Sequence, residues 1–188
     1  FGNQDDNEDT LSAKLFELGE GNVHHSIETG YYLDSFAGYS LDEEHRFNAA
    51  SGGLASWYLQ SLLDKNLVDR VICVIPNSDP MKLFHFAVLE KPEELKVATR
   101  SCYYPVEMSQ VIKQVLQTEG RYAIIGLPCF LKGIRLAMEM NQRLRKRIVV
   151  LAGLVCGQAK SKFFAEYLTC LGGGDPESLV SARFRIKS

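Results

Sequence analysis

Two cysteines could do chemistry in this chain, because each directly follows an apolar run that ends at a glycine. Cys129 follows residues 121–126, and Cys156 follows residues 148–154. Short apolar runs of this kind are typical of parallel strands buried on both faces of a sheet. Since α/β sheets bind ligands at the carboxyl ends of their strands, both thiols are expected at a ligand-binding edge.

Two thiols are only half of a metal site, because structural zinc and a four-iron cluster each take four protein ligands. The residues alone leave three interpretations open for the pair: cluster or metal ligands, ordinary core residues, or, for Cys129, a catalytic nucleophile. A helix N-terminus could activate the Cys129 thiol, but the sequence places no particular histidine as its base. Cys73, in the middle of a strand, is predicted to be a core residue, and Cys170, on a helix, is predicted to be structural.

A second motif that could bind a ligand is Ser51-Gly52-Gly53. Ser51 is a predicted helix N-cap, and the two glycines would open the first turn. Bare amides at a helix N-terminus bind phosphate, and glycines let a phosphate approach. The predicted apolar face of this helix is Leu54, Tyr58 and Leu62, with Leu59 and Leu63 beside it. The motif is therefore either a phosphate site or only a cap with a turn.

The elements that position these motifs alternate between helix and strand. Thr10 is predicted to cap a first helix through Leu18, and residues 42–46 are read as a charged turn. The predicted strands are 70–75, 82–89, 121–126, 148–154 and one from Val180; the predicted helices after the Ser-Gly-Gly helix are 92–98, 108–116, 130–141 and 163–171. This order predicts an α/β or α+β fold, with a mixed sheet, flanking helices and a βαβ unit at 121–156.

Length and composition are those of one sizeable globular domain. The chain has 188 residues, of which 46% are hydrophobic and 23% charged. Residues 1–9 are rich in acids and are predicted to be a linker or disordered segment, followed by a single α/β domain at 10–188. Because the chain begins at Phe1 and ends in the strand-like run 182–188, we expect a fragment of a longer protein.

Charge and cysteine usage restrict the cell compartment and the partners. The formal net charge of −2 gives no sign of a nucleic-acid footprint. No apolar run approaches the length of a membrane span. Five cysteines are an odd number without tight disulfide spacing, which favours a reducing, cytoplasmic compartment with free or metal-bound thiols.

Five motifs, taken together and in order, resemble those of a known family. They are Arg46 with Ala50-Ser51-Gly52-Gly53; Pro92-Glu93-Glu94-Leu95 followed by Ser101-Cys102-Tyr103; Gly126-Leu127-Pro128-Cys129 with Gly133 and Ile134; Gly153-Leu154-Val155-Cys156-Gly157; and Phe184-Arg185-Ile186-Lys187. Over residues 45–187 the chain resembles the beta subunit of coenzyme F420 hydrogenase and its dehydrogenase relatives.

The resemblance implies a flavin iron–sulfur oxidoreductase. Members of that family bind FAD and a 4Fe–4S cluster, pass electrons between them, and exchange hydride with a soluble partner such as coenzyme F420. A ferredoxin or another redox protein is the implied protein partner. The family's pattern assigns Ser51, Gly52 and Gly53 to FAD phosphate and Cys129 and Cys156 to the cluster. The other implied cofactor contacts are Ser101, Tyr103, Gly126, Pro128, Arg185 and Lys187, the last two near anionic groups of the cofactor.

The chain departs from the family pattern at two positions and in one segment. Cys102 stands where the family has lysine, so one positive charge near the cofactor is missing, and Phe130 stands where the family has glutamine. No Cys-x-x-Cys-x-x-Cys segment is present, so at most Cys129, Cys156 and Cys102 are available as ligands. A cofactor-free α/β interaction module, which keeps the fold without the redox chemistry, is therefore the alternative, and the fragment can be isolated without cluster or flavin.

Overall fold

The structure is a computed structural model that describes residues 7–16, 21–77, 79, 81–98 and 100–185. Its contacts divide the chain into two compact units, Phe1–Gly38 and Tyr39–Ser188. The division falls after Gly38, whereas the sequence analysis expected one after residue 9. Each unit is described by itself.

The first unit contains a helix and a two-stranded hairpin. Helix α1 is Glu8–Phe16, and strand β1 (His24–Ser26) pairs antiparallel with β2 (Gly30–Tyr32). The amide of Thr10 donates to Asn7 Oδ1 at 2.9 Å, so the side chain of Asn7 caps the helix. The prediction that Thr10 is the cap was wrong, and the helix begins inside the segment expected to be a linker. Leu18, the predicted end of this helix, lies outside the described residues.

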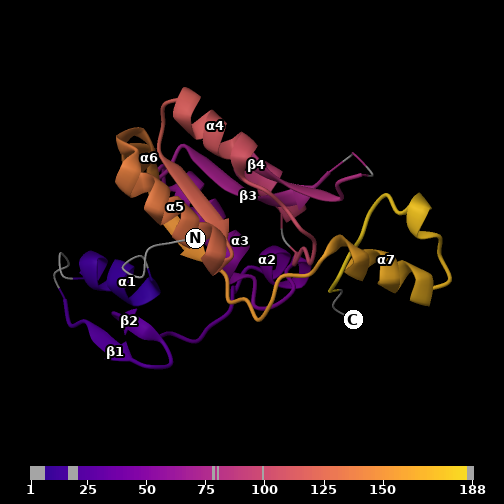
Figure 1. The fold of residues 1–188 in the computed structure, drawn as a ribbon, viewed down its shortest axis with the longest axis horizontal. Helices are drawn as coiled ribbons and strands as arrows, with labels where there is room; N and C mark the ends of the chain where they lie inside the picture. The colour runs from indigo at the N-terminus through magenta and orange to yellow at the C-terminus, as the bar shows by residue number, and fades with distance from the viewer. Residues whose placement is uncertain (1–6, 17–20, 78, 80, 99, 186–188) are drawn as a thin grey trace. The chain divides into compact units, whose positions relative to one another are not determined.

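The second unit is built on a mixed four-stranded sheet with the order β4-β3-β5-β6. Strands β3 and β4 of this sheet are labelled in Figure 1. The strands are β3 (Arg70–Pro76), β4 (Phe84–Leu89), β5 (Tyr122–Gly126) and β6 (Ile148–Gly153). The pair β3–β4 is antiparallel, and the pairs β3–β5 and β5–β6 are parallel. The predicted α/β class, the mixed sheet and the parallel pairing of the two strands of the βαβ unit are confirmed.

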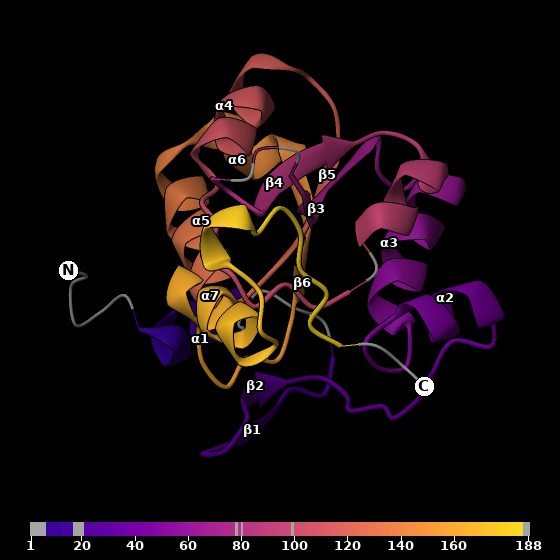
Figure 2. The ribbon, with the colours of Figure 1, turned by 90° about the vertical axis from the view of Figure 1, so that its right-hand side faces the viewer.

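Helices cover both faces of this sheet (Figure 2). On one face, α4 (Ser109–Gln117), α5 (Pro128–Met140) and α6 (Gln142–Arg147) pack around Ile72, Phe86 and Ile124. On the other face, α3 (Leu54–Asp64) and the 3-10 helix η2 (Pro92–Ala98) pack around Val71, Cys73 and Ala123. Residues of β3 and β5 contribute to both clusters, so these central strands have the near-continuous apolar sequence of buried parallel strands.

The connection from β5 to β6 uses two helices where the sequence predicted one. Helix α5 ends at Met140, and Asn141 adopts an extended conformation with φ −133°. The side chain of Asn141 then accepts from the amides of Arg143 at 3.0 Å and Leu144 at 3.2 Å, which caps α6. Asparagine is a strong N-cap residue, and this preference divides the crossover.

The charged run 42–46 is helical, contrary to the predicted turn. Helix α2 is Glu43–Asn48, and Asp42 caps it by accepting from the amides of Glu44 at 2.9 Å and His45 at 3.3 Å. A capping aspartate followed by two acids in the first turn is a helix-start signal. The aspartate accepts from amides of the first turn, and the acids offset the partial positive charge of the helix N-terminus.

The apolar face predicted for the Ser-Gly-Gly helix is only partly right. Helix α3 buries Ser56, Leu59, Leu62 and Leu63, whereas Leu54 and Tyr58 are 43% and 40% exposed. Helix α7 (Lys162–Leu171) buries only Ala165 fully, and four of its apolar side chains are exposed: Phe163, Tyr167, Leu168 and Leu171. Cys170 is also exposed, whereas Cys73 is buried as expected.

The last described residues form no strand, contrary to the prediction of one from Val180. A short 3-10 helix, η3 (Pro176–Ser178), precedes residues 179–185, which have no regular structure. Ala182 and Phe184 pack against the cluster of Leu83, Phe84 and Ala165. The alternation of apolar and polar residues therefore reflects a segment that packs with one side against this cluster, and not a strand that is hydrogen-bonded in a sheet. Among the described residues, no helix has the length and apolar character that crossing a membrane requires.

Candidate functional site

The carboxyl ends of β5 and β6 lie side by side and lead to the two candidate cysteines. Gly126 and Gly153 are paired in the parallel ladder, and the amide of Leu154 donates to the Gly126 carbonyl at 2.9 Å. Cys129 lies three residues after Gly126, and Cys156 lies three residues after Gly153. Both thiols therefore follow the same edge of the sheet, as the sequence predicted. That their sulfurs lie within one cluster's width stays a prediction.

The two cysteines are held in different ways. Cys129 is the second residue of α5 and directly follows Pro128. Proline fits the first helical position, because the N–H group that it lacks would have no partner within the helix there. Cys156 lies in the irregular segment between β6 and α7. Both side chains are exposed. Exposure removes the interpretation of this pair as core residues and leaves both thiols accessible to iron.

The glycines around this edge differ in the room they leave. A Cβ at Gly157 would meet no atom within 4 Å, so the backbone beside Cys156 is open. A Cβ at Gly126 or at Gly153 would contact the side chain of Leu131 at 3.7 Å. Leu131 therefore covers both strand ends, and the open approach is on the side of Gly157.

The ligand set at this edge is incomplete within the described part of the chain. There, no group of three or more His, Cys, Asp or Glu residues could hold a metal ion. Two exposed thiols fit half of the four-thiolate set of a cluster, so further ligands would have to come from elsewhere.

Cys102 does not suit the role of a third ligand. Burial raises the pKa of the Cys102 thiol to about 12, and its Sγ donates to the Arg100 carbonyl at 3.6 Å. Burial also raises the pKa of Cys73 to about 12, with the nearby Cys102 as a second cause. Because the thiolate is the metal ligand and the nucleophile, both groups are kept in their inactive form at neutral pH.

Thiol alkylation is expected to separate the cysteines into two groups. At pH 8, a thiol of pKa 12 carries about a thousandfold less thiolate than one of ordinary pKa. Iodoacetamide should therefore modify Cys129, Cys156 and Cys170 in the folded protein and leave Cys73 and Cys102 until denaturant is added. Peptide mass spectrometry at timed intervals measures this, and rapid modification of Cys102 in the folded protein would contradict its burial.

The Ser-Gly-Gly motif does precede a helix, but the helix begins later than predicted. Gly53 is the N-cap of α3, with φ +80°, and a glycine has no side chain with which to cap the helix. The prediction that Ser51 is the cap was wrong. The left-handed conformation favours glycine, and a Cβ at Gly53 would lie 2.7 Å from the His45 carbonyl oxygen. Gly53 is therefore required by the fold of this turn.

This turn lies at the same end of the sheet as the two cysteines. Helix α3 packs on β3 through Leu59, Leu62 and Leu63, and only residues 65–69 connect the two elements. A helix joined to the following strand by so short a connection runs antiparallel to it. Since β3 is parallel to β5 and β6, the N-terminus of α3 faces the carboxyl edge.

Three buried polar side chains surround the turn: Ser40, His45 and Ser56. The Ser40 amide donates to the Gly52 carbonyl at 2.8 Å. His45 Nδ1 lies 3.1 Å from Ser56 Oγ, which in turn donates to the Gly53 carbonyl at 3.2 Å. Sequence reasoning missed His45, although the capping signal at Asp42 places it on a helix that directly precedes the motif.

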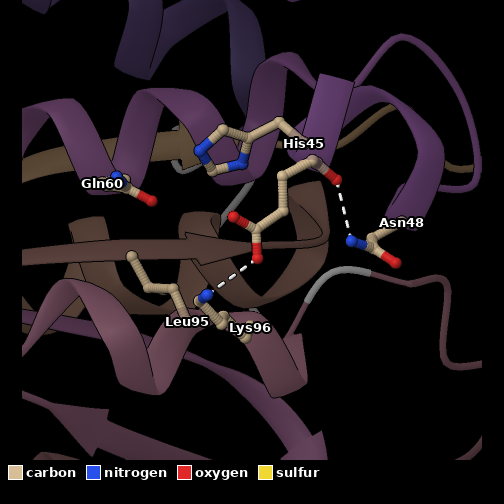
Figure 3. Close-up of a pocket in the computed structure, with 6 residues that line it drawn as sticks. His45, Asn48, Gln60, Leu95 and Lys96 are labelled. Atoms are coloured by element: carbon tan, nitrogen blue, oxygen red, sulfur yellow. Dashed lines mark hydrogen bonds and ion pairs between the residues drawn. The ribbon is translucent and has the colours of Figure 1, made fainter. Parts of the chain in front are cut away.

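A small hollow lies beside His45 between α2, α3 and η2 (Figure 3). Lys96 Nζ pairs with Glu44 Oε1 at 2.8 Å, and Asn48 Nδ2 donates to the Glu44 carbonyl at 2.9 Å. The hollow has a volume of about 20 Å³, which is enough for about one water molecule. This hollow is therefore not the place of a dinucleotide.

Two other predicted site segments are brought together by aromatic packing. The Phe184 ring lies 5.5 Å from Tyr103, 6.1 Å from Phe84 and 6.2 Å from Phe164, measured between ring centroids. Tyr103 thus contacts the residue before Arg185, whose own side chain is exposed. Ser101 is half-buried in the same loop. Lys187 lies outside the described residues.

The sheet has a parallel core covered by helices, and its carboxyl edge, the edge at which α/β proteins bind ligands, is followed by a glycine turn and two exposed thiols. Two family models match the chain: the N-terminal region of the coenzyme F420 hydrogenase/dehydrogenase beta subunit over residues 35–113, and the C-terminal region of the same subunit over residues 119–187. The chain belongs to the coenzyme F420 hydrogenase/dehydrogenase beta subunit family, a family of oxidoreductase subunits.

A solved structure has the same fold. It is a chain of the F420-reducing NiFe hydrogenase complex from Methanosarcina barkeri, with a TM-score of 0.68 and 16% sequence identity. The match covers 86% of this chain and 57% of that one, so the chain spans little more than half the length of the matched subunit. No curated protein sequence matches the chain significantly.

Proposed function

We propose that this chain is the flavin-binding and cluster-binding part of an oxidoreductase subunit. In this role it passes electrons between a 4Fe–4S cluster and FAD, and exchanges hydride with a partner such as coenzyme F420. The observation that carries the proposal is the pair of exposed cysteines that follow Gly126 and Gly153 at one sheet edge, in a chain of this family.

The chain's own residues have distinct roles in this proposal. Cys129 and Cys156 would be two of the thiolate ligands of the cluster, with the remaining thiolates from outside the described residues. The first amides of α3, after Gly52 and Gly53, would bind FAD phosphate. Arg185 and Lys187 would offset the negative charge of the cofactor.

Packing supports the other assigned contacts. Tyr103 is fixed against Phe184, which would keep Ser101 and Arg185 on the same side of the cofactor. Gly126 and Pro128 end β5 and start α5, and so would fix the place of Cys129 beside the cofactor. The cofactor would approach from the open side at Gly157. When bound, the cluster supplies one-electron transfer and the flavin supplies hydride transfer.

The partners follow from this chemistry. The matched solved chain is part of a hydrogenase complex, which supports a protein partner for this chain as well. A ferredoxin or another redox protein is the proposed electron partner, with coenzyme F420 as the candidate hydride acceptor. Free thiols and an oxygen-sensitive cluster favour a reducing, cytoplasmic compartment.

Replacing Gly52 by leucine is expected to lower the flavin content of the full-length protein severalfold, because a side chain would occupy the phosphate approach. The fold should persist, since the Gly52 carbonyl can still accept from the Ser40 amide. Flavin absorbance per mole of protein, after anaerobic purification, measures the effect. Lys65→Leu adds an apolar side chain at the other end of α3 and serves as the control. Unchanged flavin content in Gly52→Leu would reject the phosphate role.

One observation favours the cofactor-free interaction module instead. Phe130 stands where the family has glutamine, and its ring packs edge-on against Phe86 at 5.4 Å. A position next to Cys129 has therefore become part of the core. Absorption near 450 nm in anaerobically purified full-length protein decides between the two functions, because a colourless, iron-free protein would support the module.

A further inference from the structure

The turn at Gly52 and Gly53 is held by buried polar groups that a simple helix cap does not need. His45 is 8% exposed and Ser56 7% exposed. Buried polar groups cost free energy unless they are hydrogen-bonded, so a buried pair directed at one turn indicates a specific contact.

The hydrogen bonds can be assigned a direction. The Ser56 hydroxyl has one hydrogen, and it donates to the Gly53 carbonyl at 3.2 Å. Ser56 Oγ therefore accepts from His45 Nδ1–H, 3.1 Å away. The Gly53 carbonyl also accepts from the Trp57 amide at 3.1 Å. The Gly53 peptide is thus bound both by its own helix and, through Ser56, by α2.

The main chain of His45 contacts the same turn. The space where a Cβ of Gly53 would lie is only 2.7 Å from the His45 carbonyl oxygen and 2.8 Å from its carbon. Side chain and backbone of one residue therefore fix both the position and the left-handed conformation of Gly53.

We propose that His45, acting through Ser56, is a positioning residue that holds the Gly52–Gly53 turn so that the first amides of α3 are preorganised for an anion. Preorganised donors bind more tightly, because the ordering cost is met before the ligand arrives. The identity of the anion, a phosphate of FAD, rests on the proposed function. The role of His45 in holding the turn does not depend on the proposed function.

The test compares two substitutions at His45 in the full-length protein. His45→Leu removes the Nδ1 donor, whereas His45→Asn keeps an N–H donor at about the same place. Loss of this hydrogen bond should speed amide exchange at residues 52–54 about tenfold, while amides of β5 stay protected. His45→Asn should restore slow exchange. Ser56→Ala should behave like His45→Leu, and covers the case in which His45→Leu does not fold.

The control is Gln60→Ala, which changes the same hollow without a contact to the turn. FAD affinity is measured in parallel by quenching of flavin fluorescence, and we expect about tenfold weaker binding in His45→Leu and Ser56→Ala only. Wild-type exchange rates in both variants would overturn the positioning role. Fast exchange with unchanged FAD affinity would overturn the link to the anion. If the wild-type protein binds no FAD, the proposed function fails, and the exchange rates still decide the role of His45.

Discussion

Replacing Cys129 or Cys156 by serine is expected to abolish the iron–sulfur cluster of the full-length protein after anaerobic reconstitution. A serine hydroxyl is a poor ligand for the iron of such clusters, which are held by thiolates. Both thiols are exposed and follow paired glycines at one sheet edge, so each is accessible to a cluster assembled there. Iron and acid-labile sulfide per mole of protein, together with the absorption of the cluster, measure the loss.

Cys170→Ser is a well-matched control for these two substitutions. Its side chain is also exposed, so the three variants share the loss of a surface thiol and differ in the element that carries it. Cys170 lies near the end of α7 and does not follow a strand of the sheet. Cluster loss in Cys129→Ser and Cys156→Ser, but not in Cys170→Ser, is the expected result. Equal iron in all three would end the ligand assignment, and the thiols would then be ordinary surface residues.

The strands of the sheet could be predicted because their burial is encoded locally. Residues 122–126 are apolar throughout, as expected of a strand covered on both faces, and they lie between two amphipathic helices. Residues 148–153 are equally apolar, although they form the edge strand and are mostly half-exposed. The same pattern gave the parallel neighbours and the sheet edge at which both cysteines lie. Local sequence was sufficient here, because one crossover unit fixes both strand direction and the position of the edge.

The start of α3 could not be predicted because a contact from another helix determines it. Ser51 is a strong N-cap residue in isolation, and nothing local disfavours it. The main chain of α2 approaches Gly53, which adopts the left-handed conformation and becomes the cap. This shift of the helix start by two residues goes with the burial of Ser56 in place of Leu54 and Tyr58. The role of His45 was hidden for the same reason.

The strand predicted from Val180 is absent from the described residues because an alternation of apolar and polar residues is compatible with more than one backbone structure. Ala182 and Phe184 do lie on one side, as in a strand. The partner of that side is an aromatic cluster with Tyr103 and Phe164, and no neighbouring strand pairs with residues 179–185. Periodicity identifies which side chains are buried, but the pairing of the backbone depends on what lies beside it.

Replacing Gly53 by alanine is expected to lower the free energy of unfolding by about 2–4 kcal/mol. A left-handed conformation costs a residue with a Cβ about 1–2 kcal/mol. The new Cβ would also lie 2.7 Å from the His45 carbonyl oxygen, which is backbone and cannot move aside without shifting α2. Urea denaturation of the cofactor-free protein, followed by circular dichroism, measures the change.

Gly133→Ala makes the same chemical change where the structure permits it. Gly133 lies within α5, and a Cβ there would meet no atom within 4 Å. Alanine is the better helix former by about 1 kcal/mol, so this variant should be slightly more stable than wild type. A Gly53→Ala protein as stable as wild type would show that the turn does not need its left-handed glycine. The loss expected in Gly53→Ala also explains why the phosphate role is tested at Gly52: a change at Gly53 moves the turn itself, and flavin loss there would report the fold.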